Sequence, residues 1–174
     1  MNNSKFLWIF ASVLLAALTR FLPHPPNFTA IGAIALFSGF QLKDKKLALF
    51  IPLAILLFTD LFVGFHNTML AVYLGFALTT LLGISMKNAK QLTIVGMSIT
   101  SSILFFVITN FAVWASADGF YSNDLTGLGV CYSMALPFFA NSIIGDLCFN
   151  ALLFGALYFA NNSFLVKERV SIKK

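Results

Sequence analysis

Charged residues are scarce in this chain. Asp, Glu, Lys and Arg make up only 10% of its 174 residues, whereas soluble domains carry about 25%. Hydrophobic residues make up 59%, and the mean hydropathy is +0.90. This composition indicates an integral membrane protein. At about 20 residues per span, the length allows roughly five to seven helices and no sizeable soluble domain.

Several motifs that carry chemistry are also missing. The sequence contains no GxxxxGK[ST], HExxH, GxSxG or GxGxxG pattern, so neither P-loop ATP binding nor a standard hydrolase is indicated. The two cysteines, Cys131 and Cys148, show no CxxC spacing and predict neither a disulfide framework nor a zinc knuckle. The net charge of +5 is divided among short gaps between apolar runs, which does not favour nucleic acid as a partner. We expect a protein that is not an enzyme and has no cofactor.

The apolar runs predict an all-α, polytopic membrane protein with a single domain over residues 1–174. Six transmembrane helices are expected, approximately over residues 6–22, 27–42, 47–64, 68–84, 91–116 and 137–158. As one straight helix, residues 130–160 would measure about 45 Å against a membrane core of about 30 Å. We therefore expect a break near Pro137, with residues 130–136 forming a short surface or re-entrant piece.

The basic residues predict the orientation. With the N-terminus inside, ten of the eleven Lys and Arg residues lie on the cytoplasmic side and only Arg20 lies outside, as the positive-inside rule requires. Six spans then place both termini inside. The expected location is the cell inner (cytoplasmic) membrane, with the lipid bilayer as the surrounding partner. Nearly every unusual polar residue falls in the outer half, which predicts a binding cavity open to the outside.

Polar side chains within the apolar runs are the candidate binding residues, because such groups are costly in hydrocarbon unless they have partners or line a cavity. The expected pocket residues are Asn110, Trp114, Asn141 and Asp146, with Asp60 and His66 at the second outer loop and His24 and Asn27 forming a gate. Asn110 and Trp114 lie one helical turn apart and would offer an amide beside an aromatic platform. Trp114 fits the interfacial aromatic belt equally well.

Asp60 is the strongest single candidate, because an intramembrane carboxylate indicates a functional site by default. It fits two structural roles equally well, as a cap for a neighbouring helix or as the partner of Arg20. His24 and His66 could form a metal pair with Asp60. Two isolated histidines in separate loops favour loop-ordering roles instead, and no metal site is predicted.

Asp146 shares one helical stripe with Ser142 and Asn150, each four residues away. Residues at this spacing lie on one face of a helix. The stripe is compatible with a ligand site, and it also suits a buried ladder of interhelical hydrogen bonds.

Four segments carry a resemblance to a known family: His24–Phe37, Thr59–His66, Phe105–Trp114 and Ala135–Phe139. They resemble an uncharacterised bacterial membrane family described as transport proteins. The six-span plan with an outward cavity and no ATPase is also similar to the S components of energy-coupling-factor (ECF) vitamin transporters. That resemblance implies an S-component-like bundle of six helices and a ligand pocket near the outer face. It also implies docking to a transmembrane coupling subunit that works with two ATPase subunits.

The expected function is capture of a small organic, vitamin-like nutrient from the outer face, with aromatic stacking to hold a planar ring. The first alternative is a self-contained ion-coupled carrier or channel that uses Asp60 and Asp146. The second is an intramembrane enzyme with His24, His66 and Asp60 as general acid and base. No nucleophile or metal-ligand spacing accompanies those three residues, so the enzyme is the least favoured.

Overall fold

The computed structural model describes residues 11, 13–14, 17–116 and 120–172, with side chains as far as residue 160. In these residues helix is the only regular secondary structure, which confirms the all-α prediction for this part of the chain. The elements are a 3₁₀ turn, η1 (Thr19–Phe21), and helices α2 (Ile31–Gln41), α3 (Lys45–Val63), α4 (Met69–Ser85), α5 (Gln91–Ala115) and α6 (Leu125–Ile172).

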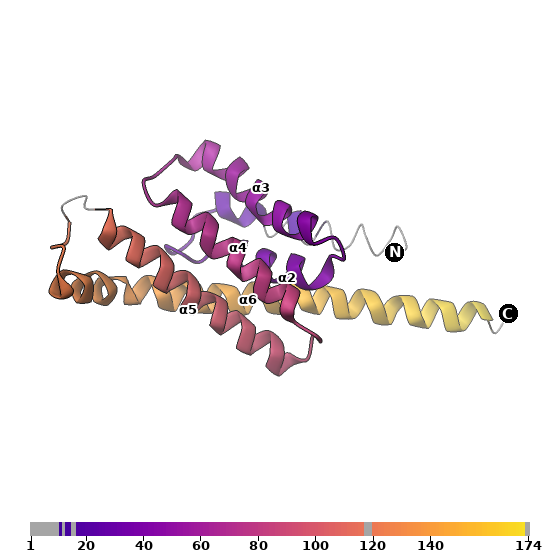
Figure 1. The fold of residues 1–174 in the computed structure, drawn as a ribbon. Helices are drawn as coiled ribbons and strands as arrows, with labels where there is room; N and C mark the ends of the chain where they lie inside the picture. The colour runs from indigo at the N-terminus through magenta and orange to yellow at the C-terminus, as the bar shows by residue number, and fades with distance from the viewer. Residues whose placement is uncertain (1–10, 12, 15–16, 117–119, 173–174) are drawn as a thin grey trace.

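Helices α3 to α6 cross the molecule in alternating directions (Figure 1). The connections between α2 and α3 and between α4 and α5 lie at one end of the bundle, and the other two connections lie toward the opposite end. The first pair of connections carries the basic residues in or beside it: Lys43, Lys45, Lys46, Lys87 and Lys90. Positive charge is therefore concentrated at one end of the bundle.

Helix α2 is the centre of the bundle and contacts α3, α4, α5 and α6. Every residue from Ile31 to Gly39 is buried. The backbones of α2 and α4 lie close together at Gly39 and Gly83. A Cβ added to Gly39 would lie only 3.0 Å from the Cα of Gly83. Small residues at a crossing point let two apolar helices approach this closely. The short helix is thus enclosed by its four neighbours.

Helix α3 continues through Pro52, which is buried. Proline has no N–H, so the carbonyl of Ala48, four residues earlier, loses its partner within the helix. The hydroxyl of Ser38 on α2 donates a hydrogen bond to that carbonyl at 3.0 Å. The central helix therefore satisfies the acceptor that Pro52 leaves free in α3.

Three helical stretches are long and apolar enough to cross a membrane: Lys45–Val63, Gln91–Ala115 and Leu125–Ala160. Large hydrophobic side chains are exposed along them, as on lipid-facing surfaces; examples are Phe50, Phe62 and Leu92. The predicted span 68–84 corresponds to α4, which has 17 residues. The predicted span 6–22 lies mostly outside the described residues.

The predicted span 27–42 is corrected by the structure. Helix α2 begins only at Ile31 and has 11 residues, which at about 1.5 Å per residue gives about 16 Å. That length is roughly half of a membrane core of about 30 Å. The apolar composition of this segment reflects burial among other helices.

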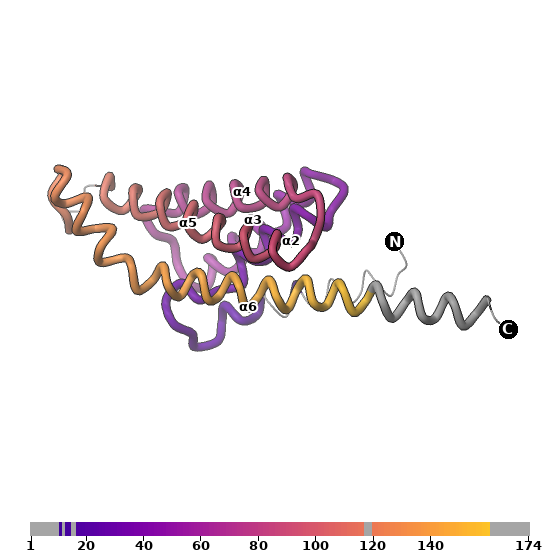
Figure 2. Tube along the Cα trace, turned by 90° about the horizontal axis from the view of Figure 1, so that it is seen from below, coloured from indigo at the N-terminus to yellow at the C-terminus, as the bar shows by residue number. Residues whose placement is uncertain are grey.

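The structure also corrects the prediction of a break near Pro137. Residues 130–136 and the predicted span 137–158 belong to one continuous helix, α6, with Pro137 inside it. Figure 2 shows that α6 changes direction in its orange first part. On one side of the proline, Tyr132 Oη donates to the carbonyl of Val107 at 2.7 Å. On the other, the rings of Phe139 and Phe106 stack at 4.5 Å. These contacts with α5 hold the helix on both sides of Pro137.

Candidate functional site

A cavity of about 310 Å³ lies among the helices, beside the first turn of α2. Three kinds of side chain line it. Hydrogen-bonding groups are Arg20, Asn27, Thr29, His66, Thr68, Thr79, Ser101, Thr109, Asn110, Ser142 and Asp146, aromatic groups are Phe76, Phe105 and Phe138, and aliphatic groups are Ile31, Leu56, Val72 and Val113. The rings of Phe76 and Phe105 lie 4.7 Å apart between centroids. The cavity lining is therefore mixed polar, aromatic and aliphatic.

The structure brings four of the eight candidate residues to the cavity and leaves four outside its lining. Asn27, His66, Asn110 and Asp146 line it. Asp60, Trp114, Asn141 and His24 do not line it, and each makes a contact elsewhere.

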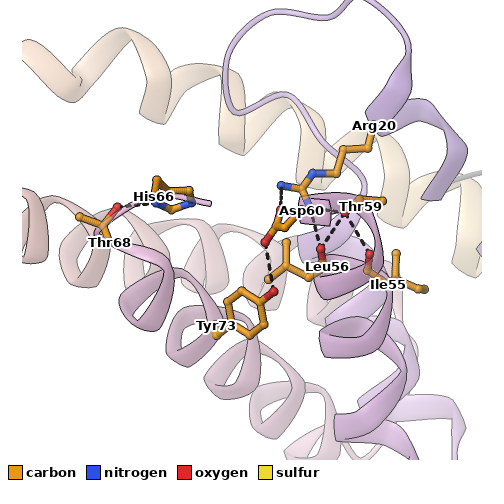
Figure 3. Close-up of polar contacts among 8 residues, drawn as sticks. All are labelled: Arg20, Ile55, Leu56, Thr59, Asp60, His66, Thr68 and Tyr73. Atoms are coloured by element: carbon orange, nitrogen blue, oxygen red, sulfur yellow. Dashed lines mark hydrogen bonds and ion pairs between the residues drawn. The ribbon is translucent and has the colours of Figure 1, made fainter. Parts of the chain in front are cut away.

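Asp60 is held by side chains from two other elements (Figure 3). Arg20 Nη2 lies 2.7 Å from Asp60 Oδ1, and Tyr73 Oη donates to Asp60 Oδ2 at 3.1 Å. The guanidinium of Arg20 also donates to the hydroxyl of Thr59 and, at 3.4 Å, to the carbonyl of Leu56. The pairing of Asp60 with Arg20 is therefore present. It ties the end of η1 to α3, and Arg20 itself reaches the cavity wall.

The two histidines do not come together with Asp60. His24 is half-buried, and its Nδ1 lies 2.9 Å from the carbonyl of its neighbour Pro25. His66 Nδ1 lies 3.0 Å from the hydroxyl of Thr68, toward which it points in Figure 3. Among the described residues there is no group of three or more His, Cys, Asp or Glu side chains that could hold a metal ion.

Asp146 lies deep in the bundle, with 8% of its surface exposed. Its Oδ2 accepts a hydrogen bond from Ser102 of α5 at 2.7 Å, and one turn further along α6 Asn150 Nδ2 donates to Ser98 at 2.8 Å. The interhelical ladder that the sequence spacing allowed is therefore present between α5 and α6. Asp146 takes part in it and lines the cavity as well.

Asp146 also packs against the first turn of α2. A Cβ added to Gly32 would overlap the carboxylate and lie 3.0 Å from Asp146 Cγ. Glycine at this position makes room for the carboxylate. The first turn of a helix carries unpaired N–H groups and a partial positive charge, which favours a negative group here.

The chain before α2 covers one side of the cavity and is fixed by a tight turn. Asn27 has φ of 63°, and the N–H of Phe28 bonds to the carbonyl of Pro25 at 3.0 Å. Proline followed by a left-handed Asn is typical of a type II turn. Asn141 of α6 donates to the carbonyl of Pro26 at 3.0 Å. Asn141 therefore anchors this turn from outside the cavity.

Asn110 and Trp114 have separate roles in the structure. Asn110 lines the cavity, and its amide donates to the carbonyl of Phe106 on its own helix at 2.8 Å. Trp114 Nε1 donates to the carbonyl of Ser122 at 3.0 Å, which ties α5 to the connection that follows it. The aromatic residues that line the cavity are Phe76, Phe105 and Phe138, and Trp114 is not among its lining residues.

Sequence reasoning placed Arg20 only as a partner of Asp60, and it did not single out Thr68, Thr79 or Ser101, which also line the cavity. One signal could have indicated which face of α5 points to the interior. Along α5, Ser98, Ser102, Phe105 and Thr109 recur at intervals of four, three and four residues, which is the spacing of a single helical face. A polar stripe within an apolar helix faces other protein or a cavity.

The fold and the cavity define a class: an all-helical protein with three stretches of membrane-crossing length and a mixed polar and aromatic cavity among its helices. The chain belongs to a family of unknown function, DUF6580, whose model matches residues 1–169. No curated protein and no solved structure matches it. The similarity to ECF S components therefore remains a prediction.

Proposed function

We propose that this protein captures a small organic molecule, of the size and character of a vitamin, from the outer face of the cell inner membrane. The cavity is the observation that carries this proposal. Its volume of about 310 Å³ is within the range of small-molecule sites. Such sites combine an apolar lining with a few convergent polar groups, and here Phe76 and Phe105 line the same cavity as Asn110 and Asp146.

The proposed orientation is N-in and C-in with six membrane segments, of which α2 is a short inner one. Three cavity residues, Asn27, His66 and Thr68, belong to the segment before α2 and to the α3–α4 connection. The α3–α4 connection lies toward the end opposite the basic connections (Figure 1). Because basic connections stay in the cytoplasm, the cavity would face outward.

Labelling with a membrane-impermeant maleimide tests this orientation. The background is a protein in which Cys131 and Cys148 are replaced by serine. A single cysteine from His66→Cys should react in intact cells, and one from Lys45→Cys should react only after the membrane is permeabilised. The opposite result would reverse the proposed orientation.

The turn at Pro25–Phe28 is the proposed gate. It is held to α6 by Asn141 and, through η1, to α3 by the pair of Arg20 with Asp60. Asn27 lines the cavity from this turn. Release of the Asn141 contact would let the turn swing away and admit a ligand, with Arg20 and Asp60 remaining as the hinge.

Capture is better supported than a self-contained ion-coupled carrier. A carrier of the expected kind would use Asp60 and Asp146 as relay groups. Asp60 is already paired with Arg20 and Tyr73 and does not line the cavity. By analogy with S components, the partner would be a transmembrane coupling subunit with two ATPase subunits.

Two threonines on α5 give a matched test of ligand binding. Thr109 and Thr100 each donate to the carbonyl four residues earlier, but Thr109 lines the cavity and Thr100 is exposed. Thr109→Trp should fill the cavity, whereas Thr100→Trp should place the same side chain outside. The measurement is thermal unfolding of the purified protein with a panel of vitamins and related heterocycles.

At least one compound should stabilise the wild type and Thr100→Trp but not Thr109→Trp. A ligand present at 100 times its Kd contributes about 2.7 kcal/mol, which is readily seen as a shift in Tm. No shift with any compound, or an equal shift in Thr109→Trp, would contradict binding in this cavity.

A further inference from the structure

The formal charges around the cavity do not balance. Arg20 and Asp146 are the two formally charged residues among the described side chains that line it. The charge of Arg20 is matched by Asp60 at 2.7 Å. Asp146 has no ion-pair partner among the described residues, and its hydrogen-bond donor there is the neutral hydroxyl of Ser102. The cavity lining therefore carries one carboxyl group without an ion-pair partner among the described residues.

The described groups next to Asp146 are neutral. α2 contributes Gly32, α5 contributes the hydroxyl of Ser102, and neighbouring positions on α6 are Ser142 and Asn150. The first turn of α2 supplies only a partial charge of about +0.5. A buried carboxyl group is costly to ionise without a cation, and Asp146 is among the residues that line the cavity.

We propose that the captured molecule carries a basic nitrogen, as a protonated amine or an amidine, that pairs with Asp146. This inference rests on the proposed function and names the chemical class of its ligand. The nitrogen would supply the missing positive charge and a charge-assisted hydrogen bond. The body of the ligand would lie against Phe76 and Phe105, whose ring pair is 4.7 Å apart. Arg20 would not compete, because Asp60 already neutralises it.

The test uses probe pairs that differ in charge and share one body: tryptamine and tryptophol, benzylamine and benzyl alcohol, benzamidine and benzamide. Binding to the full-length protein is measured by calorimetry. At least one cationic probe should bind about tenfold or more tightly than its neutral partner. Asp146→Asn should remove this preference. The control on the same helix is Ser133→Ala, an exposed position, and it should keep the preference.

Thr109→Trp is the second variant and covers a failure of Asp146→Asn to fold. It keeps the carboxylate but fills the cavity that Thr109 lines, so binding of the cationic probe should be lost. Equal binding of charged and neutral partners, persistence of the preference in Asp146→Asn, unchanged binding of the cationic probe in folded Thr109→Trp, or no binding by any probe would each overturn the proposal. If the compound that binds is neutral and its binding is lost in Thr109→Trp, the requirement for a basic nitrogen would be overturned. The proposed capture function would still stand.

Discussion

Arg20 Nη2 lies 2.7 Å from Asp60 Oδ1, and this ion pair joins the segment before α2 to the buried side of α3. Asp60 is 1% exposed, and Tyr73 from α4 donates to its second oxygen. Three elements therefore meet at one carboxylate. Since Arg20 also lines the cavity, the pair fixes one edge of that cavity.

Removing one member of this pair should be more harmful than removing both. Asp60→Leu leaves the guanidinium of Arg20 without its anion, and Arg20→Met leaves the carboxylate of Asp60 without its cation. Loss of one partner of a buried pair costs up to about 3–5 kcal/mol. The double variant Arg20→Met with Asp60→Leu leaves no unpaired charge and should cost less than either single change. Thermal unfolding in detergent measures all three. A double variant whose loss equals the sum of the single losses would show that the two side chains are not coupled.

Ser38→Ala should lower the free energy of unfolding by about 1–3 kcal/mol, because it removes the donor to the buried carbonyl of Ala48. Ser85→Ala removes an exposed hydroxyl that bonds within its own helix and should have little effect. Pro52→Ala restores an N–H for the same carbonyl, so Ser38→Ala should cost less in that background. An equal cost in both backgrounds would contradict the repair of α3 by Ser38.

Gly83→Ala should separate α2 from α4, because a Cβ at Gly83 would overlap the carbonyl oxygen of Leu36. Overpacking of this kind costs about 1–3 kcal/mol. Gly96→Ala on α5 is the matched control. Nothing lies within 4 Å of a Cβ at that position, and alanine is the better helix former by about 1 kcal/mol, so this variant should be neutral or slightly more stable. Similar losses in the two variants would be inconsistent with close packing at Gly83.

The start of α6 should be sensitive to acid through Asp124. The N–H of Gly127 and the hydroxyl of Ser122 donate to its carboxylate, and these bonds hold its pKa below the ordinary 3.8. Because the pKa of Asp124 is lowered in the folded state, its carboxylate stabilises the fold above pH 3.8. This stabilisation is lost as the pH falls toward the pKa of the folded state. The difference in Tm between the wild type and Asp124→Ala should therefore be constant at neutral pH and shrink below about pH 4. A difference that grows in acid would contradict this assignment.

Composition and the boundaries of apolar runs predicted α3, α4 and α5 closely. The predicted span 47–64 corresponds to Lys45–Val63, and the predicted span 91–116 to Gln91–Ala115. Lys46, Gly64, Lys87 and Lys90 lie at or near ends of these helices and mark those boundaries locally. The same reasoning did not show that 27–42 is a short inner helix, because a segment buried in protein and one exposed to lipid have the same apolar character.

The differences between expectation and structure elsewhere arise from contacts distant in sequence. The local rule for proline predicted a break at Pro137, but packing against α5 on both sides holds α6 continuous. Asn141 and Trp114 are polar residues in apolar helices, as a site would require, yet their partners are the carbonyls of Pro26 and Ser122. Sequence spacing indicates which side chains share a face of one helix. It does not indicate which distant backbone group they will bind.

Native mass spectrometry of the protein extracted from its own membranes in mild detergent shows whether the cavity beside Gly32 and Asp146 holds a small organic molecule. An additional non-lipid mass is expected on the wild type and on Thr100→Trp, and it should be missing from Thr109→Trp. The same bound mass on all three proteins would place the molecule elsewhere and contradict the assignment of this cavity as the binding site.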